Sequence, residues 1–142
     1  MRILIAFISL LVFTNCSSNS VNDQNCQFLL DVTVNESINL NFPVYSQLQF
    51  PSNPTYIPNI GNGGIIVTNT GSGFAAFDAA DPNRIFEACS ILTIEGLNGV
   101  TSCDDKNEYN LFTGEPVNNG NLRCSLRRYR TELNGNILVI FN

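Results

Sequence analysis

Two short segments between residues 79 and 105 carry most of the side chains that could do chemistry. The first contains Asp81-Pro82-Asn83 and the second Thr101-Ser102-Cys103-Asp104. Carboxylate and thiol groups are both metal ligands. The chain has no histidine, so a metal centre here would have to rely on oxygen and sulfur donors.

The elements that must position these segments are short strands. Residues 28–34 and 37–42 alternate apolar with polar side chains, which predicts two strands with one buried face each. Residues 63–70 and 73–80 flank Gly71-Ser72-Gly73, a hairpin signal. Residues 91–96 and 99–103 join at Asn98-Gly99, and residues 129–133 and 136–142 join at Asn134-Gly135. Both dipeptides favour type I′ turns.

Little else in the pattern is regular. Residues 43–58 hold four of the six prolines, which predicts an irregular segment or one at a sheet edge. The last strand is apolar on both faces, as a central strand or one covered on both faces would be. One helical turn or two is expected after Asp81, with Asp81 as N-cap and Pro82 at the first helical position. The fold class predicted is all-β, a small sandwich or partly open barrel of about eight to ten short strands.

The N-terminus reads as an export signal. Residues 3–13 are an apolar run behind Arg2, too short to span a bilayer but typical of a signal peptide. Cys16 follows the run directly, which resembles the lipobox of bacterial lipoproteins, although Asn15 stands where a small residue is usual. The alternative is an ordinary secretion signal in which Cys16 is incidental. We expect a signal peptide over residues 1–15, lipidation of Cys16, a flexible tether over 16–25 and one domain over 26–142, anchored at the cell envelope outside the cytoplasm.

Charge and cysteine content agree with that location. Without Arg2, six basic side chains face twelve acidic ones, a formal charge of −6, which argues against binding nucleic acid. Four cysteines remain beyond Cys16: Cys26, Cys89, Cys103 and Cys124. In an oxidising compartment they predict two disulfides, with three possible pairings.

From about residue 63 onward the order of elements resembles a Rieske domain. In that family two hairpins each lead into a loop that ligates a [2Fe–2S] cluster, and a strand pair closes the sheet. Asp81-Pro82-Asn83 lies where the first loop has Cys-Pro-His, and residues 101–104 lie where the second has Cys-Pro-Cys-His. Residues 109–116 resemble the aromatic-then-Thr-Gly strand that follows, and residues 126–140 the closing hairpin.

The departure from the family pattern falls on the ligands. A Rieske cluster needs two thiolates and two neutral imidazoles. Asp81 and Thr101 replace the thiolates, and Asn83 and Asp104 replace the imidazoles. The resemblance therefore implies the frame of a Rieske domain with a degenerate site, no cofactor and no metal. The alternative that fold analogy suggests is a Rieske-type [2Fe–2S] electron-transfer protein.

The resemblance also implies a disulfide pairing. Some Rieske domains link the two cluster loops by a disulfide, and Cys89 and Cys103 fall near those positions. That leaves Cys26 and Cys124 as the second pair. A bond between Cys89 and Cys103 would close a loop of about 15 residues and contribute roughly 3 kcal/mol by restricting the unfolded chain.

Three aspartates and four arginines could each have either a binding role or a purely structural one. Asp81, Asp104 and Asp105 could converge on calcium or magnesium, or Asp81 could cap a helical turn while the other two face water. The basic residues Arg123, Arg127, Arg128 and Arg130 could form an anion or partner patch, or protect an edge strand from pairing with other chains; the second is favoured.

Catalytic signals are missing from the sequence. It has no histidine base, no Gly-x-Ser-x-Gly elbow and no phosphate loop. We therefore expect a lipoprotein that is not an enzyme and acts as a binding or structural module, with an envelope protein or ligand as partner. A hydrolytic enzyme is the least supported class.

Overall fold

The computed structural model describes residues 26–117 and 120–142. The expected signal peptide (residues 1–15), the lipidation at Cys16 and the whole tether (16–25) lie outside these residues and stay predictions. No helix in the described part of the chain is long and apolar enough to cross a membrane.

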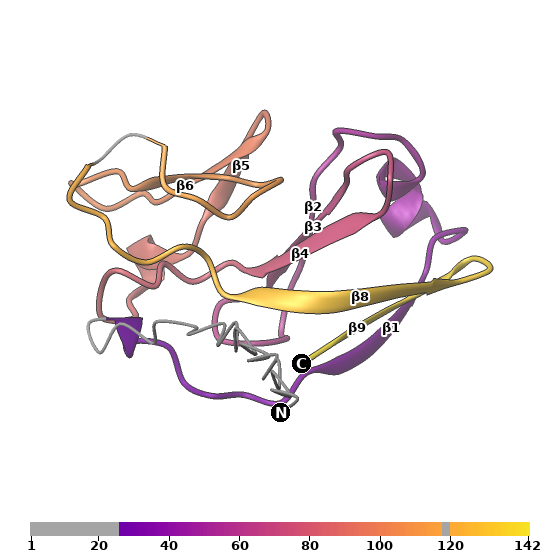
Figure 1. Ribbon diagram of the computed structural model, residues 1–142, viewed down its shortest axis with the longest axis horizontal. Coiled ribbons are helices and arrows are strands. Elements are labelled where there is room, and N and C mark those ends of the chain that lie inside the picture. The colour runs from indigo at the N-terminus through magenta and orange to yellow at the C-terminus, as the bar shows by residue number, and fades with distance from the viewer. Residues whose placement is uncertain (1–25, 118–119) are drawn as a thin grey trace, which may run out of the picture.

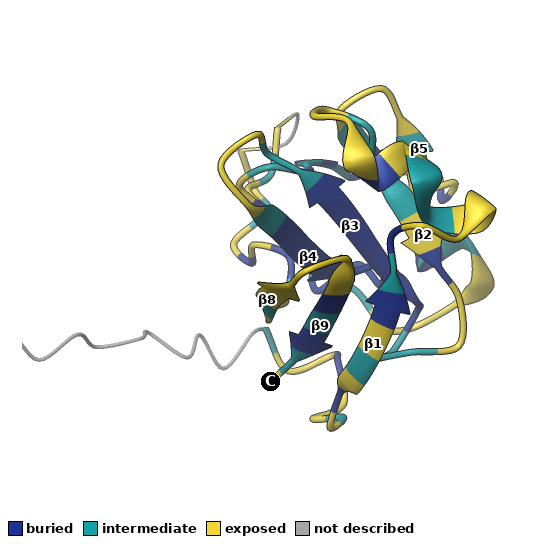
Figure 2. Ribbon diagram, turned by 90° about the vertical axis from the view of Figure 1, so that its right-hand side faces the viewer, coloured by how far each residue is buried: buried dark blue, intermediate teal, exposed yellow. Residues whose placement is uncertain are grey.

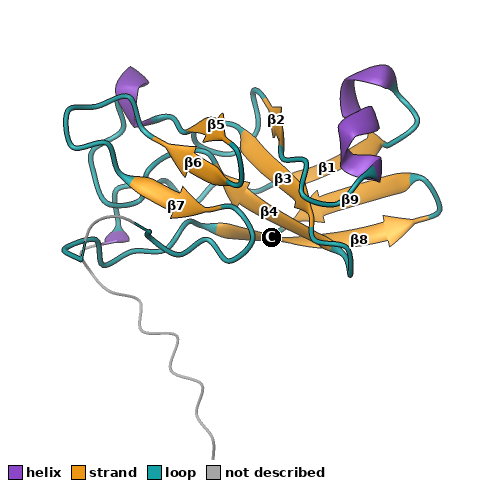
Figure 3. Cartoon of the chain, turned by 90° about the horizontal axis from the view of Figure 1, so that it is seen from above, coloured by secondary structure: helices purple, strands orange, loops and turns teal. Residues whose placement is uncertain are grey.

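The described residues form nine strands in two antiparallel sheets, which confirms the predicted all-β class. The larger sheet curls into a partly open barrel, and the smaller one lies at one end of it (Figures 1 and 3). The larger sheet runs, in spatial order, β1 (Asn35–Asn39), β9 (Ile137–Phe141), β8 (Arg128–Asn134), β4 (Phe74–Asp78), β3 (Ile65–Asn69) and β2 (Thr55–Ile57). The smaller sheet runs β5 (Thr93–Glu95), β6 (Asn98–Val100) and β7 (Glu108–Asn110).

The strand pair β3–β4 carries a core on each of its faces. Ile65 and Val67 pack on one side against β1, β9 and the 3₁₀ helix η2 (Pro43–Gln49). Ile66 and Phe77 pack on the other side against the small sheet. Burial on both faces explains why β3 is almost wholly apolar and β-branched, and Figure 2 shows it buried along its length.

Buried Asp78, at the end of β4, fixes the chain around it. Its Oδ2 accepts hydrogen bonds from the Asn62 backbone (2.8 Å), the Asn62 side chain (3.0 Å) and the Tyr129 hydroxyl (2.7 Å). Its Oδ1 accepts from the backbone of Gly63 (3.1 Å) and Ala80 (2.9 Å). Five donors meet the demand of a carboxylate removed from water. One side chain thus joins β4 to the loop before β3 and to β8.

Residues 28–34 form no strand, contrary to the prediction. The backbone here is held by side chains instead: Asn62 binds Leu30, and Asn142 binds Val34. Phe28 and Leu30 are exposed. The second expected strand (37–42) forms only in part, as β1 over residues 35–39, which buries Ile38 but leaves Phe42 outside the strand and exposed. The alternation of apolar and polar residues in 28–34 could not reveal that β1 already pairs with the outer edge of β9.

The two Asn-Gly turns were predicted at the wrong residues. Pairing of Glu95 with Asn98 leaves Gly96-Leu97 as the turn, and pairing of Asn134 with Ile137 leaves residues 135–136. In each case the first turn residue is a glycine at positive φ, as a type II′ turn requires. Gly99 instead lies in β6, where a Cβ would come within 3.2 Å of Leu92 and Leu111.

Three of the remaining local predictions are confirmed and one is wrong. Residues 71–73 do form the β3–β4 hairpin loop, and β9 is central in its sheet. The proline-rich segment gives η2, a loop and the edge strand β2. The helical turn expected after Asp81 is wrong: residues 82–83 form a simple turn, and the nearby 3₁₀ helix η3 (Ala88–Ser90) is capped by Glu87.

A glycine comparison tests whether Asp78 organises its surroundings. At Gly61 (φ +69°) a Cβ would lie 2.7 Å from Asp78 Oδ2 and 2.8 Å from the Tyr129 hydroxyl oxygen. At Gly135 (φ +62°) it would meet nothing within 4 Å. Both Ala variants carry the same positive-φ penalty. We expect Gly61→Ala to lower the free energy of unfolding in urea by about 1–3 kcal/mol more than Gly135→Ala. Equal losses would show that the Asp78 contacts are easily rearranged.

Candidate functional site

The two segments singled out in the sequence are neighbouring loops at one end of the domain. The first loop, residues 81–90, leaves β4 through a bridge between Ala80 and Ile91. The second loop, residues 101–107, joins β6 to β7, and a hydrogen bond from the Thr101 backbone to the Asn107 carbonyl closes it (3.0 Å). The β5–β6 hairpin connects them and sets them side by side.

Asp81 is fully buried, and its carboxylate is occupied. Its Oδ1 accepts hydrogen bonds from the Asn83 backbone (2.8 Å) and the Tyr109 hydroxyl (2.6 Å), and its Oδ2 accepts from the Asn107 side chain (2.7 Å). The bond to Asn83 closes an Asx turn, which replaces the helical N-cap expected from the sequence. Asp81 thus joins its own loop to the second loop and to β7.

Asn83 uses its whole amide group in a second set of contacts. Its Nδ2 donates to the Tyr109 hydroxyl (2.7 Å) and to the Cys124 carbonyl (2.8 Å). Its Oδ1 accepts from the backbone of Arg123 (3.1 Å) and Cys124 (3.0 Å). The side chain therefore clamps the first loop to the segment before β8. At this position an amide has the role of a structural connector.

The second-loop positions do not join this network in the same way. Thr101 is buried, and its hydroxyl has no partner within the described residues. Asp104 is exposed and lines a surface groove. Asp105, expected to approach Asp81 and Asp104 as an ion ligand, forms an ion pair with Arg84 (2.8 Å). The three aspartates are therefore not brought together, and the calcium or magnesium interpretation finds no support in this arrangement.

Tyr109 and Asn107 are the functional neighbours that sequence reasoning missed. Tyr109 lay within the segment noted for its likeness to a Rieske strand, but its hydroxyl was given no role. Burial, and after it the hydrogen bond to Asp81, raises the pKa of the Tyr109 hydroxyl well above its ordinary value. A neutral tyrosine is therefore the donor that balances the buried carboxylate. A polar Asn-x-Tyr beside apolar Leu111 was the available signal.

Both disulfides that the resemblance implied are present. Cys89 pairs with Cys103 and joins the two loops, with 4.9 Å between their Cα atoms. Cys26 pairs with Cys124 across 98 positions of sequence. The loops also bond without the sulfurs, since the Ser102 backbone donates to the Cys89 carbonyl (3.0 Å).

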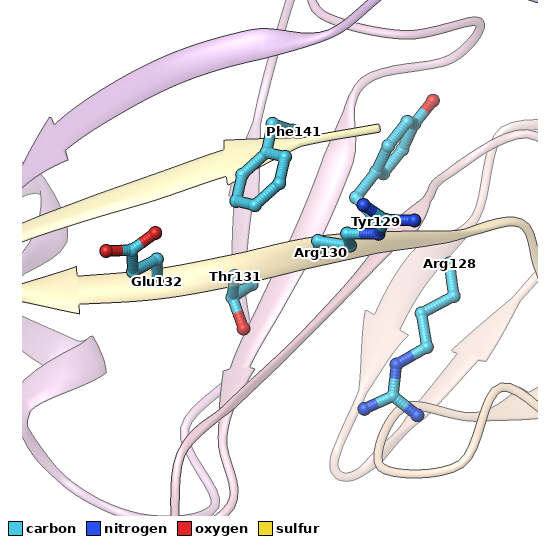
Figure 4. Close-up of a pocket in the computed structure, with 6 residues that line it drawn as sticks. All are labelled: Arg128, Tyr129, Arg130, Thr131, Glu132 and Phe141. Carbon is cyan, nitrogen blue, oxygen red and sulfur yellow. The ribbon is translucent and has the colours of Figure 1, made fainter.

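The four arginines do not form one cluster. Arg127 bonds the Leu30 carbonyl and lies 3.6 Å from Asp31, so it holds the N-terminal segment. Arg128 and Arg130 both line an open groove of about 570 Å³ with Thr131, Glu132 and Phe141, and Figure 4 shows Arg128 extending away from Phe141. Its guanidinium lies 5.8 Å from the Phe77 ring centroid, a cation–π contact. The edge-strand explanation is wrong, because β8 has β9 on one side and β4 on the other.

Removal of the Tyr109 hydroxyl tests the buried network. Tyr109→Phe leaves Asp81 with fewer donors and Asn83 with one acceptor less, so we expect the free energy of unfolding to fall by about 1–3 kcal/mol at neutral pH. A raised folded-state pKa contributes stability in full below about pH 10, the unfolded value, and loses it as the pH rises further. The variant should therefore also lose less stability between about pH 9 and about pH 11 than the native chain does.

The control is Tyr45→Phe, which removes a hydroxyl that makes no hydrogen bond within the described residues. Urea unfolding at each pH measures both variants. The same alkaline slope in Tyr109→Phe and the native chain would contradict the assignment of a protected, neutral Tyr109.

Comparisons with known proteins give one result. No family model matches the chain, and no curated protein matches it. Among solved structures, the chain is similar to the ferredoxin of carbazole 1,9a-dioxygenase from Nocardioides aromaticivorans IC177. The two share 16% sequence identity with a TM-score of 0.47, over 77% of this chain and 96% of the ferredoxin.

Proposed function

We propose that this protein is a membrane-anchored lipoprotein of the cell envelope whose Rieske-like domain works without a cluster, as a non-enzymatic binding or structural module. One observation carries the proposal. The residues at the first-loop ligand positions, Asp81 and Asn83, are committed to hydrogen bonds that hold the loops, β7 and the segment at Cys124 together.

The donor set does not fit a [2Fe–2S] cluster. Such a cluster takes thiolate and imidazole ligands, whereas Asp81, Asn83, Thr101 and Asp104 offer carboxylate, amide and hydroxyl groups. Ligation by Asp81 would also release the buried Asn107 amide and the Tyr109 hydroxyl from their acceptor, at about 1–3 kcal/mol for each group left unpaired. Electron transfer by a Rieske centre is therefore the weaker candidate.

An enzymatic role has little support from the buried acids. Asp78 and Asp81 are fully buried, and their oxygens accept five and three hydrogen bonds respectively. Both carboxylates are engaged with donors from the protein and lie away from the surface, where a substrate would have to meet a general base. The proposed partner is an envelope protein or ligand, and the anchor is the lipid on Cys16.

Iron content tests the cluster-free proposal. We expect the purified protein to be colourless, to contain no stoichiometric iron and to keep its melting temperature when a chelator is added, since hydrogen bonds and disulfides hold the loops. Metal analysis, a visible spectrum and a melting curve with and without EDTA measure this. Two irons per chain with visible charge-transfer bands would overturn the proposal.

Fractionation tests the anchor separately. The native chain is expected in the membrane fraction, and Cys16→Ser in the soluble extracytoplasmic fraction, because acyl chains can attach only to the cysteine. Ser17→Ala, one position later, is the matched control and should stay with the membranes. A Cys16→Ser chain that remains membrane-bound, or a soluble native chain, would refute the lipoprotein assignment and leave the cluster-free domain unaffected.

A further inference from the structure

A surface groove of about 430 Å³ is lined in part by the disulfide between the two loops. Charged and polar side chains surround it: Arg84, Glu87, Ser102, Asp104 and Asp105. Cys89 is half-buried and Cys103 is buried, while Glu87 is exposed. A carboxylate oxygen of Glu87 and the two sulfurs all lie within 4.8 Å of one another. Within the described residues, this is the only group of three or more Cys, Asp and Glu side chains so close together.

Other contacts besides the S–S bond also join the two loops. The Ser102 backbone donates to the Cys89 carbonyl (3.0 Å), and the ion pair between Arg84 and Asp105 (2.8 Å) bridges the loops on the outside. A capping box between Glu87 and Ser90 fixes the turn that carries Cys89. Opening of the disulfide would therefore leave two thiols facing each other, with Cα atoms still near their 4.9 Å separation.

We propose that the reduced form of this pair, together with Glu87, is a binding site for a thiophilic divalent cation, with Zn²⁺ as the fitting ion. Zinc takes thiolate sulfur at about 2.3 Å and carboxylate oxygen at about 2.0–2.2 Å in a tetrahedral arrangement. Two such sulfurs lie roughly 3.8 Å apart, a separation that the two facing side chains reach by rotation about Cα–Cβ. Glu87 is the third ligand, since its Oε2 already lies 3.6 Å from Cys89 Sγ. Water or a groove aspartate completes the site.

The chemistry balances with a dithiol as reductant. The dithiol gives two electrons and two protons to the Cys89–Cys103 bond and becomes a disulfide itself. The ion then binds both thiolates and displaces the two protons. Arg84 lies 3.6 Å from Glu87 Oε2, so ligation by Glu87 replaces this ion pair, while Arg84 keeps its shorter contact with Asp105 (2.8 Å). The disulfide thus excludes the ion and its reduction creates the site, which is separate from the buried Asp81 network and from the cluster question.

Co²⁺ serves as the spectroscopic probe for zinc. The full chain carrying Cys16→Ser is measured oxidised and after reduction, with the reductant removed under anaerobic conditions. We expect one Co²⁺ per chain with sulfur-to-cobalt charge-transfer bands in the reduced chain, displaced by Zn²⁺, and no such bands in the oxidised chain. Cys89→Ser with Cys103→Ser should lose the bands. The paired control, Cys26→Ser with Cys124→Ser, should keep them after reduction.

Glu87 has its own test. Loss of even a supporting partner of a metal ligand typically costs about 10- to 100-fold in affinity, so Glu87→Gln is expected to weaken Co²⁺ binding at least about tenfold. Glu95→Gln, on strand β5, is the control and should leave the affinity unchanged. The proposal is overturned if the reduced chain shows no charge-transfer bands, if Glu87→Gln binds as the native chain does, or if circular dichroism shows that reduction unfolds the loops.

Discussion

The burial of two carboxylates, Asp78 and Asp81, is the constraint on which the rest of this structure depends. An ionised carboxylate taken from water is costly unless donors surround it. Asp78 is the last residue of β4 and Asp81 follows three positions later. Hydrogen-bond donors must therefore reach this point from other parts of the chain. Asp78 draws the loop before β3 and strand β8 inward, and Asp81 draws in β7 and the second loop. These bonds accompany the apolar packing of the small sheet on β3–β4, where Ile66 and Phe77 meet Leu92 and Leu111.

Each buried carboxylate accepts a hydrogen bond from a neutral tyrosine. Tyr129 donates to Asp78 and Tyr109 to Asp81, and in both cases burial is the main cause of the raised tyrosine pKa. The two pairs lie on opposite sides of the same strand end, one facing the barrel and one facing the loops. Hydrogen bonds to charged groups are the stronger kind, so two such pairs give direction to a fold whose apolar contacts are non-directional.

The sequence predicted the class of the fold because strand periodicity and glycine-bearing turns are local signals. It located the β3–β4 hairpin and the central position of β9 for the same reason. It failed where tertiary contacts decide: residues 28–34 alternate like a strand but find no partner, and Gly99 serves packing against Leu92 and Leu111 rather than a turn. The sequence identified Asp81 and Asn83 as site positions. Only the folded chain shows that the Tyr109 hydroxyl and the Asn107 amide hydrogen-bond to the Asp81 carboxylate, and that Asn83 bonds to Tyr109.

The Arg cluster illustrates the same limit. Four basic residues close together in sequence suggested one surface property, yet Arg127 contacts the N-terminal segment while Arg128 and Arg130 line a groove elsewhere. Arg128 also makes a cation–π contact with Phe77, which Arg130 does not share. Successive side chains along a strand point to opposite faces, so residues close in sequence can lie far apart on the surface. The number of nearby charges therefore does not show whether they form a patch.

The Cys26–Cys124 bond has a mechanical consequence. It joins residues 98 positions apart, so residues 26–124 form a covalently closed ring. A pull applied to the chain before Cys26 crosses the sulfur bridge to Cys124 and continues into β8 and β9. The first six strands after Cys26, both loops and β7 lie on the ring and carry no tension through their backbone. A domain held at its N-terminal end would thus keep its loop end unstrained, while load passes to two long strands that are hydrogen-bonded along each other.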